Sequence, residues 1–572
     1  MLRPLLPGVR GDKKLQKERF TGRSAGSPAL CLPAPPAVGT GVGRQGRGAS
    51  LVALSNLRKE DTKMARGMCK VLATLFCVGL IIIGLCAEVL GQPKTLIVGI
   101  GTEAPDLLPS SQNQGTMDRT YSIYEPLVWL DEDAKPVPRL ATKWEAMDGN
   151  KRWRFHLRRD VLFHNGEKFT AEDVGFTIDF SKKPENKLGR RGKVVGYTYK
   201  IVDDYTIDIF REDGKPVDPV LPSAWLPIHM LSKPTVTKMA VGEFPRKPIG
   251  TGPFQFVEWK EGEQITLKAF DKYWGGKPKI DRVIFKAIPE LATRLVALKT
   301  GEVDVIRDIP AEEIKSLQAD PNIRVVEKPS LYSMHLVIRS DMPPFKDNID
   351  LRKAVAHAIN AEAICKDILG GFAIAEGQVN PPAAFGYNKN LKPYKYDPEL
   401  AKEYLKKAGY KGEEISIQSS TGRYLKDIEI TTAVEMFLKE VGFRTRLNMY
   451  DWPTWMDKYN TKKIDLLLYE GWAARSGDAA ENLYNVFHSK SPFCYYGEKG
   501  IPGVDELIDT AATNFDPEVR RQALGKAQEI VHDYYACGFY STPLKVYGVR
   551  KNVKWSPRAD ETTCFSHTDE KL

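Results

Sequence analysis

The side chains best able to do covalent chemistry are spread along this chain without the spacing of a known active site. The eight histidines are scattered, and none forms the H-E-x-x-H pattern with which one helix holds zinc. The sequence also lacks the G-x-S-x-G turn of a serine hydrolase and the P-loop of a nucleotide-binding enzyme. We therefore expect a binding protein with no catalytic residue, no metal ligands and no cofactor; an exported hydrolase is the alternative.

Two short patterns resemble functional motifs but have simpler explanations. Glu172 and Asp173 are adjacent acids, but they follow Thr170 at the start of an expected helix. Negative charge is favourable there because the first backbone N–H groups of a helix are free. The G-x-G-x-x-G spacing at 41–46 follows no strand pattern and opens no helix, so it does not indicate a dinucleotide site.

The cysteines are too widely separated for a zinc site. Four of the eight precede the expected mature start, and the others are Cys365, Cys494, Cys537 and Cys564. No C-x-x-C spacing occurs among them. In an exported protein one or two disulfides could form, and two bridges would allow three pairings. The sequence does not choose among these pairings.

The net charge of +10 comes from the N-terminal region. Residues 1–70 hold 14 Lys and Arg against 4 Asp and Glu, which leaves 69 residues of each sign in 71–572. A neutral body has no general attraction for a polyanion. We therefore expect no nucleic-acid partner.

An uncharged apolar segment precedes the expected globular part. Residues 71–87 follow Arg66 and Lys70, which is the pattern of a secretory signal. A membrane span needs about 20 apolar residues. We expect a signal peptide over 64–91 that is removed on export, and hence an extracytoplasmic protein; a retained anchor is the alternative.

The first 63 residues have the composition of a disordered segment. They are rich in Gly, Pro, Ser and Arg and show no sustained apolar periodicity. We expect 1–63 to be a disordered extension, or a segment that is not translated because synthesis begins at Met64 or Met68.

The densest pattern in the chain predicts a strand, a turn and a capped helix. Trp153, Phe155 and Leu157 alternate with polar residues, as in a strand with one buried face. The Asn-Gly pair at 165–166 favours a turn, and Thr170 can cap the helix that follows. Locally, this stretch is a piece of α/β core.

The remaining chain alternates strand and helix patterns in two blocks. Residues 280–306 show strand, helix and strand, which predicts a βαβ unit. Helix spacing over 351–369 and a buried strand over 464–469 belong to the second block. We expect lobe I to comprise 92–345 plus 531–572, and lobe II to comprise 346–530. The C-terminal strand pattern suggests that the chain crosses back to lobe I.

Seven short blocks occur in order along the chain: YEPLV at 124–128, LATKWE at 140–145, FHNG at 163–166, FTAEDV at 169–174, GTGPF at 250–254, YW at 273–274 and GEVD at 301–304. Together they resemble the extracytoplasmic solute-binding proteins of family 5, which are the peptide, dipeptide, glutathione and nickel binding components of bacterial ABC importers. The resemblance implies an α/β fold of two lobes that close on a solute, with an extra domain inserted at about 120–240. It also implies a monomer that delivers a short peptide or peptide-like solute to a membrane permease.

The resemblance also suggests ligand-binding residues. Arg423 and Tyr424 lie in a segment similar to the loop from which dipeptide-binding relatives extend an arginine to the ligand carboxylate. The planar guanidinium suits this task because it can bind both carboxylate oxygens. The alternative is a surface ion pair of Arg423. Phe385, Trp452 and Trp455 lie in or near expected loops and could stack on a ligand, or they could be structural.

The segment from Trp472 to Asp478 resembles the ligand-contacting loop that follows the buried strand in relatives. Dipeptide binders commonly place an acid three residues after this tryptophan, whereas this chain has Arg475. Either Asp478 substitutes for that acid, or Arg475 makes a doubly basic pocket for an anionic ligand such as glutathione or a blocked peptide. A nickel or metallophore binder of the same fold is the alternative function, because a metal can arrive inside an organic chelator.

Overall fold

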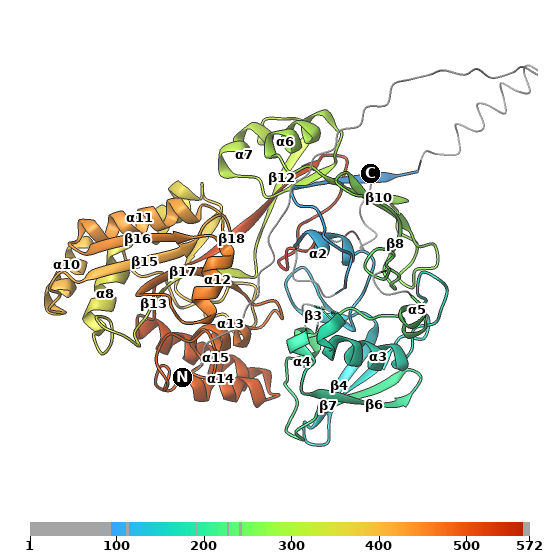
Figure 1. Cartoon of the computed structure of the whole chain (residues 1–572), viewed down its shortest axis with the longest axis horizontal. Coiled ribbons are helices and arrows are strands. Elements are labelled where there is room, and N and C mark those ends of the chain that lie inside the picture. The colour runs from blue at the N-terminus through green and yellow to red at the C-terminus, as the bar shows by residue number, and fades with distance from the viewer. Residues whose placement is uncertain are drawn as a thin grey trace, which may run out of the picture. The chain divides into compact units, whose positions relative to one another are not determined.

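The computed structural model describes residues 93–563 and 565, with gaps at 110–113, 187, 189–190, 226–227, 240–242 and 564. The described residues belong to one compact unit (Figure 1). The expected signal peptide, the segment 1–63 and Cys564 lie outside the described residues. Within the described part, no helix is long and apolar enough to cross a membrane.

A twelve-stranded sheet organises this unit. Its strands run in the order β16-β15-β17-β13-β18-β11-β1-β10-β9-β8, and β12 and β14 also pair with β18. Figure 1 shows the long β18 running from one group of elements to the other. The bounds are β1 Thr95–Ile100, β8 Phe254–Lys260, β9 Gln264–Ala269, β10 Arg282–Ala287, β11 Val305–Arg307, β12 Ile323–Pro329, β13 Tyr332–Ile338, β14 Ala373–Glu376, β15 Glu414–Ser420, β16 Arg444–Tyr450, β17 Leu467–Ala473 and β18 Cys537–Arg550.

The predicted βαβ unit is present in the first part of the sheet. Strand β10 is followed by α6 (Leu291–Thr300) and β11, and both strands pair with β1 in parallel. Helix α6 ends at Gly301, whose φ of 80° is a left-handed conformation that glycine adopts easily. Helix α7 (Ala311–Gln318) follows β11.

A separate four-stranded sheet contains the strand predicted from Trp153 to Leu157, and the predicted turn and helix follow that strand in the chain. Its order is β4-β5-β7-β6, with bounds β4 Ala141–Met147, β5 Arg152–Leu157, β6 Tyr197–Asp203 and β7 Thr206–Arg211. The side chains of β5 alternate between buried and half-buried, as the pattern predicted. Helix α3 (Ala171–Lys182) starts after Thr170, whose backbone N–H donates to Asp173 at 2.9 Å.

Several short elements lie outside these two sheets. They are α2 Gln114–Thr120, β2 Val128–Leu130, β3 Pro136–Pro138, η1 Pro184–Asn186, η2 Arg191–Lys193, α4 Leu221–Ala224 and α5 Lys233–Lys238. Strands β2 and β3 pair with each other in an antiparallel hairpin.

In the second block, helices cover both faces of the parallel strands β15, β16 and β17. One hydrophobic core packs α8, α10 and α11 against the sheet, and another packs α12 to α15. The bounds are α8 Ile349–Ala358, α9 Ala361–Ala363, η3 Ile364–Ile368, α10 Pro398–Lys407, α11 Asp427–Glu440, α12 Trp452–Asn460, α13 Ala479–Phe487, α14 Val504–Thr513 and α15 Pro517–Asp533.

Two sequence-based boundaries were wrong. The helix predicted over 351–369 breaks at Ile359, because Asn360 accepts a hydrogen bond from the Ala363 N–H and starts a new helix. The strand predicted over 464–469 begins later and continues to Ala473. Its last residues stay extended because they pair with β13, so Trp472 lies opposite Ser333 in the sheet and not in a loop.

The three described cysteines of the mature part, Cys365, Cys494 and Cys537, are buried and free. No disulfide therefore joins any two of them. In the described part of the chain, no group of three His, Cys, Asp or Glu side chains could hold a metal ion.

Candidate ligand-binding site

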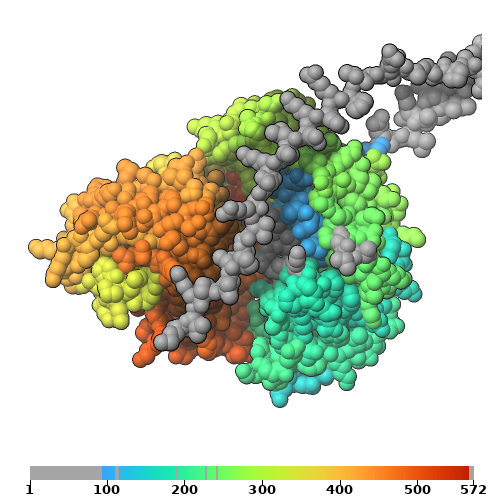
Figure 2. All heavy atoms as spheres, in the orientation of Figure 1, coloured from blue at the N-terminus to red at the C-terminus, as the bar shows by residue number. Residues whose placement is uncertain are grey.

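A cleft lies where the parallel strands β15, β16 and β17 end. It has a volume of about 280 Å³ and is lined from the ends of these strands and from α12. Ligands of open α/β sheets collect at the carboxyl ends of parallel strands, where the strand ends and following loops present side chains. In Figure 2, the surface is hollowed between the orange spheres that include these elements and the blue and teal spheres.

Two arginines converge on one tyrosine in this cleft. The Nη2 atoms of Arg423 and Arg475 each lie 3.5 Å from the hydroxyl oxygen of Tyr332. Among the described residues, neither guanidinium has a carboxylate within ion-pair distance. The expected alternative of a surface ion pair for Arg423 is therefore not found there. Two cations with no carboxylate in contact can receive an anion from outside.

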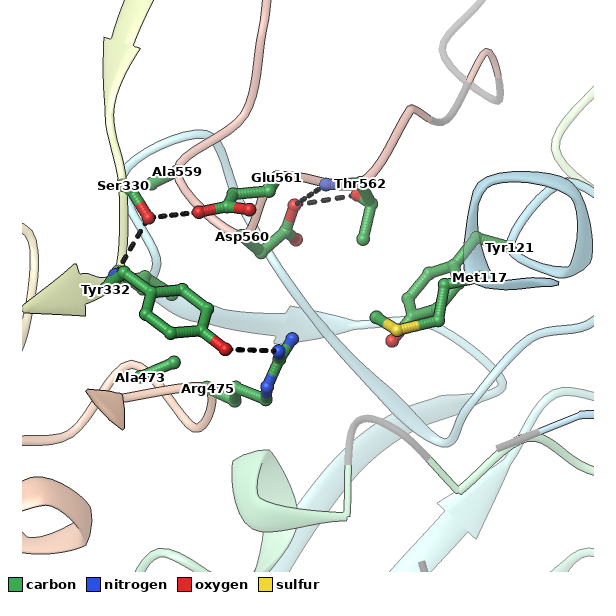
Figure 3. Close-up of a pocket in the computed structure, with 11 residues that line it drawn as sticks. Met117, Tyr121, Ser330, Tyr332, Ala473, Arg475, Ala559, Asp560, Glu561 and Thr562 are labelled. Carbon is green, nitrogen blue, oxygen red and sulfur yellow. Dashed lines mark hydrogen bonds between the residues drawn. The ribbon is translucent and has the colours of Figure 1, made fainter. Parts of the chain in front are cut away.

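Electrostatics keep Arg475 charged in this partly enclosed position. Burial acts to lower the pKa of its guanidinium, but the neighbouring Tyr332, Glu561 and Tyr121 outweigh burial and raise that pKa. Figure 3 shows Arg475 beside Tyr332, with Met117 and Tyr121 on the far side of the opening.

Aromatic rings support Arg423. Its guanidinium carbon lies 5.4 Å from the Tyr424 ring centre and 5.2 Å from that of Trp452, which is within cation–π range. Trp452 and Trp455 were expected in or near loops, but both lie on α12, which Asp451 caps by accepting from the Thr454 N–H. Trp452 stays 39% exposed, whereas Trp455 is part of the core.

The Trp472 side chain also lines the cleft. Its Nε1 donates to Glu470 Oε1 at 3.3 Å, and its ring packs on Phe493 with centres 5.0 Å apart. Glu470 lines the cleft as well. The sequence analysis did not select it, although a glutamate inside the apolar run IDLLLYEGW is an available signal.

Asp478 and Phe385 form a different group, outside the lining of the cleft. Asp478 caps α13 by accepting from the Ala480 N–H at 2.9 Å and pairs with Arg520 at 2.8 Å. Phe385 is held beside it by a hydrogen bond from its N–H to Gly477 O at 2.7 Å, and its ring faces Arg520 and Arg521. The structure thus brings Arg423, Tyr424, Trp472 and Arg475 together and leaves these two apart.

A small cavity of about 20 Å³ extends the cleft past Arg475 (Figure 3). On one side Glu561 accepts a hydrogen bond from Ser330, and its other oxygen lies 3.3 Å from Lys545 Nζ. The opposite side is formed by Met117 and Tyr121, around α2. Residues far apart in the sequence therefore meet at Arg475.

Comparison with known proteins identifies the family. The model for "Bacterial extracellular solute-binding proteins, family 5 Middle" matches residues 135–493, more than half of the chain. The chain belongs to the family 5 solute-binding proteins. The family, the two-lobed α/β fold and the role of substrate-binding component of an ABC importer, all expected from the resemblance, are thereby confirmed.

Relatives and solved structures agree over most of the chain. The dipeptide-binding protein of Escherichia coli (strain K12) is 28% identical, covering 83% of this chain and 94% of the relative. The glutathione-binding protein GsiB of Salmonella choleraesuis (strain SC-B67) is 27% identical, covering 78% and 90%. The periplasmic binding protein DppA from Helicobacter pylori, solved with the peptide STSA, superposes with a TM-score of 0.68 at 27% identity, covering 84% and 98%.

Proposed function

We propose that this protein captures a short peptide or peptide-like solute that bears a carboxylate, outside the cytoplasm, and delivers it as a monomer to an ABC permease. Lobe I would comprise 92–345, with its insertion at about 120–240, together with 531–572; lobe II would comprise 346–530. Relatives named for binding a dipeptide or glutathione, and a solved relative in complex with the peptide STSA, support a peptide-like ligand.

The convergence of Arg423 and Arg475 on Tyr332 carries the proposal. Guanidinium groups bind carboxylates through two parallel N–H donors, and such charge-assisted hydrogen bonds are about twice as strong as neutral ones. Two of the carboxylates around the cleft already have cationic partners: Glu481 binds Lys193 at 2.9 Å, and Glu561 lies beside Lys545. The two arginines are therefore the groups that remain for a solute carboxylate.

Contacts across the opening suggest how a solute would be enclosed. Lys193, at the end of η2, pairs with Glu481 of α13, and Phe515 packs on Trp153 of the four-stranded sheet with ring centres 5.4 Å apart. A solute that touches both sides would favour the conformation in which these contacts form, because it binds that conformation better. The permease would then recognise the closed form.

The test begins with native purification and mass spectrometry of the small molecules that stay bound. The recovered solute is then titrated against the wild type and Arg423→Ala. We expect Arg423→Ala to weaken binding more than tenfold without changing the melting temperature, because within the described residues the Arg423 side chain contacts the Tyr332 hydroxyl and aromatic faces and makes no ion pair. Arg444→Ala, which removes an arginine that is 70% exposed, serves as the matched control. If Arg423→Ala and Arg444→Ala bind the recovered solute with equal affinity, Arg423 does not bind its carboxylate.

A further inference from the structure

Glu470 is a buried carboxylate in the lining of the cleft. It is 3% exposed, and the Trp472 Nε1 atom donates a hydrogen bond to it at 3.3 Å. In the described part of the chain, no lysine or arginine lies within ion-pair distance of it. A buried charge normally has a cationic partner, because leaving water costs several kcal/mol. Glu470 is therefore a buried acid without a lysine or arginine partner among the described residues.

The neighbouring histidine, His335, is poorly placed to act as the cationic partner of Glu470. His335 lies opposite Glu470 in the β13–β17 pair, so both side chains project from the same face of the sheet. The His335 Nε2 atom is 3.5 Å from Glu470 Oε1, but neither ring nitrogen makes a hydrogen bond of normal geometry within the described residues. A carboxylate built to hold this imidazole would be expected at a shorter distance.

Aromatic side chains form the walls around the carboxylate. Tyr459 stacks on Phe493 with ring centres 5.2 Å apart, and Phe493 packs on Trp472. Burial, above all, and the neighbouring Glu470 raise the pKa of the Tyr459 hydroxyl. All three rings line the same cleft as Glu470. A carboxylate among aromatic faces is suited to an organic cation, since the faces attract positive charge and a bare metal ion would want more oxygen or nitrogen ligands.

The lining of the cleft therefore carries an acid as well as the two arginines. Tyr424 lies near charges of both signs: burial, above all, and the charge of Glu470 raise the pKa of its hydroxyl, while Arg423 acts to lower it. A solute with one positive and one negative group could bind the acid and the arginines at once.

We infer that Glu470 is the binding residue for a basic nitrogen of the solute, an ammonium or guanidinium group, while Arg423 and Arg475 hold its carboxylate. This inference rests on the proposed function and narrows the ligand to a zwitterion. Dipeptide binders commonly have an acid at the position of Arg475. In this chain Glu470, two residues before Trp472, would supply the missing carboxylate. The doubly basic pocket for a purely anionic solute is then not required.

The experiment uses three peptides, Ala-Ala, Ala-Phe and Ala-Ala-Ala, each also as its N-acetyl form and as its C-terminal amide. Equilibrium dialysis with mass-spectrometric detection measures their retention by the full-length protein, Glu470→Gln and Glu470→Asp. We expect the wild type to prefer free amines over N-acetyl peptides more than tenfold, and Glu470→Gln to reduce that preference to within twofold. Glu470→Asp, which keeps the charge, should retain an intermediate preference. Glu440→Gln, at an exposed position on α11, is the control.

Each other outcome has a defined meaning. Equal retention of free and acetylated peptides by the wild type, or an unchanged preference in Glu470→Gln, overturns the inference. A melting temperature that falls by several degrees in Glu470→Gln while the preference persists assigns Glu470 a structural role and overturns it too. Loss of preference for a free carboxylate in Arg423→Ala tests the proposed function separately.

If the wild type retains no peptide, the peptide part of the proposed function fails, and the solute recovered from the native protein decides about Glu470. A solute with a basic nitrogen that Glu470→Gln releases supports the inference. A solute without one, or nickel retained in the absence of any chelator, overturns it.

Discussion

Asp478 and Glu470 are buried acids on either side of Trp472, but only Asp478 has a guanidinium partner. Asp478 pairs with Arg520 and caps α13. Asp478→Ala would leave Arg520 as a buried charge without its partner, which typically costs about 3–5 kcal/mol. We expect a loss of that order in the free energy of unfolding, measured with urea. Asp516→Ala, which removes an exposed cap from α15, should cost only about 0.5–2 kcal/mol. Similar losses in both variants would contradict a role for the buried pair.

The sequence identified some cleft residues and missed others for a physical reason. Arg423, Tyr424, Trp472 and Arg475 lie in segments that resemble those of known relatives, and the fold brings them together. Tyr332 reaches the cleft only because β13 pairs with β17, and such a pairing leaves no local mark in the sequence. Their contact with a ligand remains a prediction, as it does for Phe385 and Asp478.

At the scale of elements, the turn at 250–253 depends on close backbone contact. The Gly252 N–H donates to Ile123 O, and a Cβ on Gly250 would lie 2.1 Å from that same oxygen. Gly250→Ala must therefore displace the backbone, and we expect it to lower the free energy of unfolding by roughly 1–3 kcal/mol or more. Gly192→Ala, where a Cβ meets nothing within 4 Å, should be nearly neutral. Thermal unfolding of both variants measures the difference, and equal melting temperatures would show that the turn yields without cost.

Local signals explain which elements could be predicted. Helices α3, α10 and α15 begin directly after Thr170, Asp397 and Asp516, whose side chains are favoured at helix starts whatever surrounds them. The end of β17 could not be placed in this way, because its last residues are held extended by a partner strand. Local signals in the sequence thus predict the starts of these helices. They do not predict the end of a strand that is determined by pairing with a distant strand.

At the scale of the whole molecule, several charged groups meet between the four-stranded sheet and the helices α13 and α15. Asp218, which follows β7, lies within electrostatic reach of Asp478, Arg520 and Lys193. Burial, and then the charge of Asp478, raise the pKa of Asp218 from 3.8 to about 6, although the Val220 N–H, Arg520 and Lys193 act in the opposite direction. The region that joins the two parts of the molecule therefore carries an acid that resists ionisation.

This raised pKa predicts how stability changes with pH. Between pH 4 and 6 the unfolded chain releases the Asp218 proton while the folded chain retains it, so this residue's contribution to stability falls as pH rises. The loss is complete above pH 6 and is absent below pH 4. Asp218→Asn stays neutral, so its stability relative to the wild type should increase across this window, by up to about 3 kcal/mol at pH 7. Urea unfolding at several pH values measures this difference.

The control for this pH dependence is Asp213→Asn, a few residues away on the surface. Hydrogen bonds from Arg211, above all, lower the pKa of Asp213, so its ionised form is favoured in the folded chain. Asp213→Asn should bring no gain in the free energy of unfolding at pH 7, in contrast to Asp218→Asn. If the stability curves of Asp218→Asn and the wild type run parallel from pH 4 to 7, then Asp218 is ionised in the folded protein. The region between the four-stranded sheet and helices α13 and α15 would then hold Asp218 as a carboxylate despite its burial.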